Sequence, residues 1–303
     1  MSSEDLTGSH VAGYHLLERV GEGGTATVYR AQHASRGVCA LKVLRPRMRA
    51  DRTAAQRFLR EAAYGARVRH PGVVRTFEYG EAPDGVQYLA LEWAEGELLA
   101  KFVRRTGPVA LTLASSVVRQ VAEALAAAHA AGIIHRDLKP ENIIYDPRTQ
   151  LALLLDFGHA RDAEVSPEER LTRTGFFVGT LQYVAPEALS GALVGEAADI
   201  YSLATIAFLL LTGVLPYSAK SPRELFHQLL TKPPHTLNQA RHDLNFSREL
   251  EDVVARGLHR EPAKRQSTVV SFAGEFADAA AQPSASPRAG LLGSLKGMFG
   301  AGR

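Results

Sequence analysis

Short apolar runs rich in β-branched and aromatic residues dominate the first third of the chain, and they predict strands. Residues 51–69 instead have helical spacing and begin at Asp51, a residue type that caps helix N-termini well. The pattern therefore predicts a small strand-rich unit with one main helix. Its expected strands are residues 14–20, 27–31, 38–44 and 88–96, the last of which turns polar at its end.

The remainder of the pattern is mainly helical. Residues 111–131 form a long alanine-rich segment with an apolar stripe, and residues 198–211 are almost wholly apolar before they end at Thr212 and Gly213. Between these two segments, residues 143–145 and 151–155 are strand-like. Helices thus dominate the second part, and the two parts together predict an α+β fold.

Both ends of the chain are predicted as tails. Residues 1–13 are polar, and residues 279–303 change composition to Ala, Ser, Pro and Gly, which is typical of a linker. Within the second tail, residues 291–299 combine Leu, Met and Phe with Lys296, but their glycines disfavour a stable free helix. We predict a disordered C-terminal tail, with a peripheral contact to a membrane, a partner or the folded part as the alternative.

Composition sets the class of protein. The chain has 303 residues, of which 46% are hydrophobic and 22% charged, as in an ordinary globular protein. A net charge of +3 does not indicate a nucleic-acid partner. The single cysteine, Cys39, excludes an internal disulfide and favours a reducing compartment, and the longest apolar run, residues 203–211, is too short to be a transmembrane segment. We expect a cytoplasmic protein.

One polar run carries the chemistry. His135-Arg136-Asp137-Leu138-Lys139-Pro140-Glu141-Asn142 lies between the alanine-rich helix and a strand, where a rigid scaffold can orient a loop. Asp137 can orient a hydroxyl or accept its proton, Lys139 can neutralise a phosphoryl group, and Asn142 can ligate a hard cation. These roles indicate phosphoryl transfer to an alcohol. The run resembles the catalytic loop of protein kinases at every fixed position of H-R-D-x-K-x-x-N.

Two upstream stretches resemble the ATP site of that family. Residues 21–26 form a glycine-rich loop between two strands, whose N–H groups can fold over phosphates, although a plain tight hairpin would have the same pattern. Lys42 shares a strand face with Ala40, and an inward lysine needs an anionic partner unless it snorkels to the edge. The resemblance implies that Lys42 binds the α/β-phosphates and pairs with Glu61 of the helix. The other ATP contacts that it implies are Gly21, Glu22, Gly23 and Val28, with Ala26 in place of the third glycine, then Ala40 and, at the hinge, Leu91, Glu92 and Ala94.

The segment after the catalytic loop supplies the metal and regulatory motifs. Asp156-Phe157-Gly158 matches D-F-G, which implies that Asp156 and Asn142 hold Mg²⁺, with Mn²⁺ as the alternative ion. Residues 159–184 are polar, as in an activation segment. Thr172 and Thr174 are predicted autophosphorylation sites, with Arg136 and Arg161 as receptors for the phosphate; an unmodified flexible loop is the alternative.

Further motifs define the acceptor and the supports. Lys139 and Thr180, the latter in a match to G-T-x-x-Y-x-A-P-E, are what serine/threonine kinases carry, so a Ser or Thr hydroxyl is the expected acceptor. The resemblance also implies that Glu187 pairs with Arg265 and that Asp199 anchors the catalytic-loop backbone. Gly65 and Thr76 are smaller than the apolar groups that the family often places there, which predicts a looser contact between the helix and Phe157.

The resemblance covers residues 14–278 and is nearest to bacterial serine/threonine kinases of the eukaryotic-like (Hanks) type. It implies a bilobal fold, with a small β-rich N-lobe (14–93) carrying one main helix and a larger, mainly helical C-lobe (94–278). The expected function is transfer of the ATP γ-phosphate to Ser/Thr hydroxyls of proteins, with autophosphorylation in a transient homodimer. A pseudokinase is the alternative, but Lys42, Asp137 and Asp156 are all retained. A small-molecule kinase is less favoured because an activation segment and Ala185-Pro186-Glu187 are present.

Overall fold

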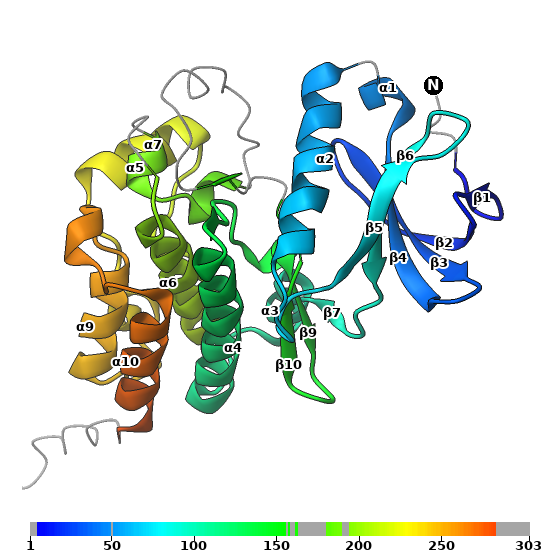
Figure 1. Ribbon diagram of the computed structural model, residues 1–303. Coiled ribbons are helices and arrows are strands. Elements are labelled where there is room, and N and C mark those ends of the chain that lie inside the picture. Colours follow the sequence, from blue (N-terminus) through cyan, green and yellow to red (C-terminus); the bar gives the residue numbers. More distant parts are fainter. Residues whose placement is uncertain are drawn as a thin grey trace, which may run out of the picture.

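A strand-rich lobe and a helical lobe lie side by side, with helix α2 at the boundary between them (Figure 1). This arrangement confirms the predicted α+β, bilobal fold. The computed structural model describes residues 5–49, 51–155, 157, 161–162, 180–189 and 194–282, without the side chains of residues 52, 53, 57, 161, 162 and 180.

The N-lobe is built on an antiparallel sheet. Within the described residues, six strands pair in the order β1-β2-β3-β4-β6-β5. β1 lies inside the segment predicted as the N-terminal tail and pairs with the start of β2. The strands are β1 (His10–Val11), β2 (Tyr14–Glu22), β3 (Ala26–His33), β4 (Gly37–Leu44), β5 (Thr76–Glu81) and β6 (Gln87–Glu92).

The two faces of this sheet bury different clusters. One face packs Leu44 and Leu89 against Phe58 and Ala62 of α2 (Arg52–Arg67). The other face buries an aromatic and aliphatic cluster that includes the Cys39 thiol. α2 follows the short α1 (Pro46–Arg49) and is capped as predicted, because Asp51 Oδ1 accepts the Ala54 N–H at 3.2 Å.

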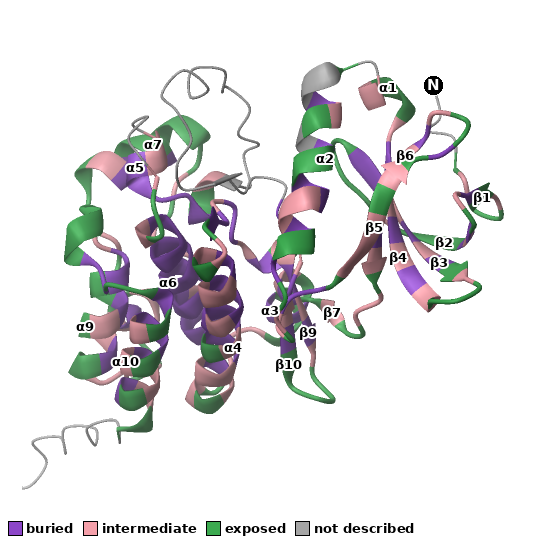
Figure 2. Ribbon diagram, in the orientation of Figure 1, coloured by how far each residue is buried: buried purple, intermediate pink, exposed green. Residues whose placement is uncertain are grey.

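The C-lobe packs around α6 (Ala197–Thr212), which is buried along almost its whole length (Figure 2). Its apolar sequence on all sides is what a central helix requires. Gly213 ends α6 in the left-handed conformation, at φ +73°, and donates its N–H to Leu209 O at 2.7 Å. The surrounding helices are α3 (Leu99–Thr106), α4 (Leu111–Ala130), α5 (Pro186–Leu189), α7 (Pro222–Thr231), α8 (Leu237–Ala240), α9 (Arg248–Gly257) and α10 (Val269–Ala281).

Short strands connect the lobes and carry the catalytic loop. Among the described residues, β10, β9 and β7 form one small sheet, and β11 pairs with β8 in another. Leu154 of β10 accepts the Val74 N–H at 3.0 Å and donates to Gly72 O at 2.8 Å, which ties the segment after α2 to the C-lobe. The short elements are β7 (Glu97–Leu98), β8 (Ile133–Ile134), η1 (Pro140–Asn142), β9 (Ile143–Asp146), β10 (Leu151–Leu154), β11 (Arg161–Asp162), η3 (Thr180–Tyr183) and η4 (Pro262–Lys264).

No helix in the described ranges combines the length and the apolar character that a membrane crossing requires.

Candidate active site

Lys42 on β4 and Glu61 on α2 form an ion pair through Nζ and Oε1. Both side chains are largely buried, so the attraction is stronger than at an open surface. The pairing that the sequence implied is present, and Lys42 does not snorkel to the sheet edge. A largely buried ammonium that is paired with a carboxylate is well placed to bind the phosphates of a ligand as well.

The face of the sheet that carries Lys42 is only partly covered. Val28 pairs with Lys42 across β3 and β4, and Ala40 pairs with Leu91 across β4 and β6, so these side chains share one face. Val28, Ala40 and Leu91 are half-buried, whereas Leu44 and Leu89 on the same face are buried beneath α2. Beyond the helix, this face therefore offers a small apolar patch at the start of the hinge, where Glu92 and Ala94 also lie.

The glycine-rich loop is the hairpin between β2 and β3. Gly21 pairs with Val28, and the Gly23 N–H donates to Ala26 O at 2.8 Å, which closes the tip. Ala26, which stands where the third glycine was expected, is buried against Leu44. The substitution thus adds a core contact and leaves the hairpin intact.

Asp137 is the centre of a compact polar network. Its Oδ2 accepts from Lys139 Nζ at 2.7 Å and lies 3.3 Å from Asn142 Nδ2. The same Asn142 amide nitrogen donates to Asp137 O at 2.7 Å. Among the described residues, none donates to the second carboxylate oxygen, Asp137 Oδ1. This oxygen can therefore accept a hydrogen bond from a hydroxyl.

Asn142 has the chemistry of a cation ligand. Because its amide nitrogen is engaged by Asp137, its Oδ1 is left for a metal ion, and amide oxygens are ligands that Mg²⁺ accepts. Asp156, the second implied ligand, lies outside the described residues. The part of the proposed Mg²⁺ site that the structure describes therefore fits the ion.

Asp199 on α6 holds the backbone of the catalytic loop, as the resemblance implied. Its two carboxylate oxygens accept the His135 and Arg136 N–H groups, each at 2.9 Å, and Oδ2 also accepts from His129 Nε2 at 2.8 Å. Arg136 is in the left-handed region, at φ +63°, which costs a non-glycine residue about 1–2 kcal/mol. The Asp199 bond offsets that strain, and Arg136 Nη2 adds a bond to Val194 O at 3.0 Å.

His135 packs on Phe157, with ring centroids 5.4 Å apart, and Phe157 faces α2 near Gly65. A Cβ on Gly65 would lie 2.7 Å from Thr76 Oγ1, closer than side chains tolerate. Glycine therefore lets the helix and the strand approach closely at this point. The predicted looseness concerned the contact between the helix and Phe157, and it stays a prediction. Phe157 itself would be 3.9 Å from that Cβ, an ordinary contact.

Glu187 and Arg265 form the buried pair that the resemblance implied. The guanidinium donates from Nη1 to Oε1 at 2.7 Å and from Nη2 to Oε2 at 2.8 Å, a bidentate arrangement. Arg265 also donates to Ala197 O at 2.7 Å, at the start of α6. The end of the activation segment is thus fixed to the central helix, and Ser202 Oγ adds a bond to Tyr183 O at 2.8 Å.

Several predicted residues cannot be placed. Thr172 and Thr174 lie outside the described residues, as does the Arg161 side chain. Thr180 begins η3, but its side chain is not described. The predictions about phosphorylation and about the acceptor contact of Thr180 remain predictions.

Comparison with known proteins identifies the family. A match to the family described as the protein kinase domain covers residues 14–277. The chain belongs to the protein kinase family.

Bacterial kinases are among the relatives of this kinase domain. It is 34% identical over 280 residues to serine/threonine-protein kinase pkn3 of Myxococcus xanthus, covering 90% of this chain and 51% of that protein. It is 38% identical over 259 residues to serine/threonine-protein kinase PknD of Mycobacterium tuberculosis, covering 85% of this chain and 38% of that protein. The chain thus spans about half or less of the length of these curated relatives.

A solved structure shows the same fold. The PknI kinase domain of Mycobacterium tuberculosis matches with a TM-score of 0.69 and 31% sequence identity, over 90% of this chain and 98% of that chain. The family match and the structural likeness therefore agree.

Three residues that support the site of this kinase domain were not predicted from the sequence. His129 donates to Asp199 from α4, Ser202 holds Tyr183, and Arg30 lies over the Trp93 ring at 5.4 Å beside the hinge. His129 follows a run of alanines at the end of α4, and Ser202 lies in the mainly apolar α6. A buried polar residue in such a position needs a partner. The position of these two polar residues in the sequence could therefore have indicated that each binds a partner in the interior.

Replacing Asp199 by Asn is expected to lower the free energy of unfolding by roughly 1–3 kcal/mol at pH 7, because an amide NH₂ would then face N–H donors. Burial would raise the pKa of Asp199, but the hydrogen bond and charge of His129, followed by His135, lower it below its ordinary value. The stability from this group is therefore complete above the ordinary carboxyl pKa near 4 and is lost as the pH falls through the lower folded pKa. Urea unfolding of wild type and variant at pH 7 and below about pH 4 checks this: the difference should shrink in acid. Equal stability at pH 7 would contradict the anchoring role.

Proposed function

We propose that this chain is an active serine/threonine protein kinase, which transfers the γ-phosphate of ATP to Ser or Thr hydroxyls of proteins. The observation that carries the proposal is that one fold holds the Lys42–Glu61 pair and the Asp137–Lys139–Asn142 network. An ammonium for phosphates and a carboxylate for a hydroxyl are the two groups that this reaction needs. The names of the relatives, all serine/threonine-protein kinases, support the acceptor type.

In the proposed reaction, the acceptor hydroxyl oxygen forms a bond to the γ-phosphorus while the bond to the β–γ bridging oxygen breaks, and ADP leaves. Asp137 Oδ1 orients the hydroxyl and receives its proton. Lys139 Nζ, held beside Asp137 at 2.7 Å, places a positive charge near the migrating group. Lys42, restrained by Glu61, binds the α/β-phosphates, so most of the acceleration comes from positioning and electrostatic stabilisation.

ATP and Mg²⁺ are part of this proposal. Asn142 and Asp156 would hold the ion, with Mn²⁺ as an alternative, and the ion would neutralise phosphate charge when bound. The adenine would lie on the half-buried patch of Val28, Ala40 and Leu91 and bond to the backbone near Glu92 and Ala94. The glycine-rich loop, with Gly21, Glu22 and Gly23, would cover the phosphates.

Regulation and location complete the proposal. Autophosphorylation of Thr172 and Thr174 in a transient homodimer would order the activation segment, and Thr180 would contact the acceptor. Protein substrates are the expected partners, and a cytoplasmic location suits the single, buried Cys39.

Intact mass after incubation with Mg²⁺ and ATP tests the activity. The wild type should gain mass in steps of one phosphate, and peptide mapping should place at least one phosphate on Thr172 or Thr174. A Lys42→Met variant is the control, because it removes the phosphate-binding ammonium while retaining an apolar stem of similar length. No gain by the wild type, with a generic Ser/Thr protein substrate also unlabelled, would refute the proposal.

A further inference from the structure

Arg45, the residue directly after β4, is bonded to the tip of the glycine-rich loop at several points. Its Nη1 lies 2.6 Å from Glu22 Oε1 and donates to Gly23 O at 3.1 Å. Its backbone N–H donates to Thr25 O at 2.9 Å. The Arg45 side chain is only 15% exposed, whereas the Glu22 side chain is 35% exposed, so the arginine is held against the protein while its acceptors face solvent.

The strand geometry connects this arginine to the lysine of the site. Ala26 and Leu44 are the last pair in the ladder between β3 and β4, so the chain passes from the ladder directly into Arg45. Lys42 lies on β4, three residues before Arg45. A shift of the loop tip is therefore resisted by the strand that also carries Lys42.

The ion pair between Arg45 and Glu22 also changes the charge of the glycine-rich loop. Its carboxylate lies in the loop that the proposed function places over phosphates, where a negative charge would repel them. Arg45 neutralises Oε1, and Arg19 approaches Oε2 at 3.1 Å from the exposed side. Because Arg45 is the more buried of the two arginines, it is the stronger compensating charge.

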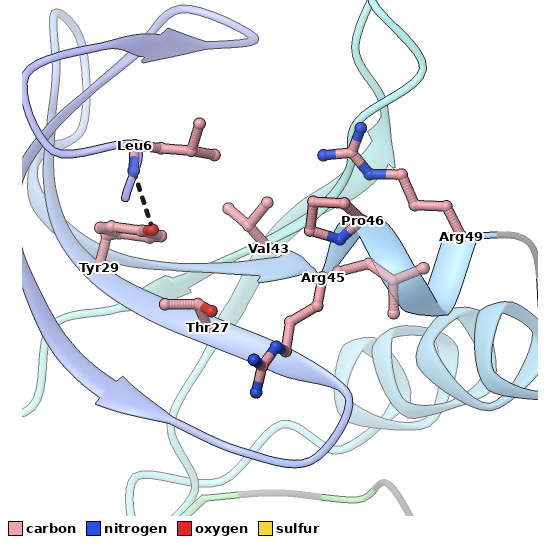
Figure 3. Close-up of a pocket in the computed structure, with 8 residues that line it drawn as sticks. Leu6, Thr27, Tyr29, Val43, Arg45, Pro46 and Arg49 are labelled. Atoms are coloured by element: carbon pink, nitrogen blue, oxygen red, sulfur yellow. Dashed lines mark hydrogen bonds between the residues drawn. The ribbon is translucent and has the colours of Figure 1, made fainter. Parts of the chain in front are cut away.

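The nearby cavity does not explain this arrangement. It is lined by Leu6, Tyr29, Val43 and Arg45, with Leu6 on one side and Arg45 on the other (Figure 3). Its volume of about 20 Å³ has room for a water molecule, which is far less than a nucleotide needs. Arg45 therefore acts on the loop and not on a ligand in this cavity.

We propose that Arg45 is a positioning residue for ATP: it holds the glycine-rich loop closed through Gly23 and Glu22 and offsets the Glu22 charge beside the phosphates. The proposal rests on the proposed function for its ligand, but the restraint on the loop exists without ligand. According to this proposal, Arg45 does not contact the reacting atoms. Its loss should weaken the binding of phosphates and leave adenosine binding unaffected.

Hydrogen exchange of the protein without nucleotide tests the restraint itself. In Arg45→Ala, the Gly23 amide, which is bonded to Ala26 O, should exchange roughly 3- to 10-fold faster, as expected for the loss of a partly exposed ion pair and its hydrogen bond. Arg49→Ala is the matched control. It removes a neighbouring arginine on α1 that, among the described residues, makes no hydrogen bond to the loop. Unchanged exchange in Arg45→Ala would overturn the proposal whether or not the protein is a kinase.

Ligand binding and kinetics test whether the loss of Arg45 weakens the binding of phosphates. Calorimetry should show roughly 3- to 10-fold weaker binding of the ATP analogue AMP-PNP with Mg²⁺ in Arg45→Ala and unchanged binding of adenosine. In steady-state kinetics, the KM for ATP should rise by a similar factor while kcat changes less than 2-fold. Arg45→Lys should recover part of the affinity because it retains a charge near Glu22. Equal weakening for both ligands would indicate general misfolding and refute a positioning role.

A double substitution separates the two contacts. Glu22→Gln removes the charge that Arg45 offsets, so Arg45→Ala should weaken AMP-PNP binding less in the Glu22→Gln background than in the wild type. If the effects of the two substitutions simply add, the charge-offset part of the proposal fails. If the wild type binds AMP-PNP without phosphorylating any protein, the proposed function fails while these binding tests retain their meaning.

Discussion

Replacing Asp137 by Asn is expected to reduce the rate of phosphoryl transfer by roughly 10²–10⁴-fold, the range for removal of a group that accepts a proton in the reaction. Two losses combine in this variant. An amide cannot take the proton from the acceptor hydroxyl, and it no longer attracts Lys139 Nζ, which lies 2.7 Å from Asp137 Oδ2. The change is nearly isosteric, so the fold and the ATP site should remain intact.

Single-turnover kinetics with a Ser/Thr peptide measure this effect, and calorimetry with AMP-PNP checks that nucleotide affinity is retained. Asp146→Asn is a matched control in the same lobe. Asp146 ends β9 and accepts the Arg148 N–H at 2.9 Å in an exposed turn, so its substitution should change the rate less than 2-fold. A rate within 3-fold of wild type in Asp137→Asn would remove Asp137 from the mechanism.

Replacing Arg265 by Met is expected to destabilise the C-lobe by roughly 3–5 kcal/mol, because it leaves the Glu187 carboxylate buried without its main partner. The Arg265 side chain is fully buried, and Glu187 is 8% exposed. The substitution also frees Ala197 O and His259 O, which accept from Arg265 at 2.7 and 2.8 Å. Each of these carbonyls then requires water or another donor.

Urea unfolding followed by circular dichroism should show a lower midpoint without a change of slope. Arg256→Met is the control, because Arg256 and Glu275 form a pair of similar length, 2.6 Å, on an exposed surface, where an ion pair contributes about 0–1 kcal/mol. The double variant Glu187→Leu with Arg265→Met should regain part of the loss, since it buries no unpaired charge. Equal midpoints for Arg265→Met and Arg256→Met would show that burial does not strengthen this pair.

Local patterns predicted the elements well. The strand of Lys42, the capped helix of Glu61 and the apolar α6 all follow from periodicity and caps over short windows, and all are present. The pairs Lys42–Glu61 and Glu187–Arg265 came from motifs, because residues 19 and 78 positions apart cannot be brought together by local pattern.

What the sequence did not predict depends on side-chain geometry between elements. Gly65 was interpreted through its missing side chain, whereas the tight fit against Thr76 depends on how close α2 lies to β5. Arg45 was only one more cation after an apolar strand, and a charge of that kind is usually solvated. Its contacts with Glu22 and Gly23 depend on the exact pairing of β3 and β4.

The burial of α6 also bears on how such a chain can diverge. Asp199 fixes the catalytic loop to this helix, while Arg265 and Ser202 fix the end of the activation segment to it. The loop of Asp137 and the end of the activation segment are thus both attached to one buried helix. We expect substitutions at exposed positions such as Phe226 to leave Asp137 in place. The exposed surface of such a chain can therefore change in evolution while the geometry of the catalytic loop is retained.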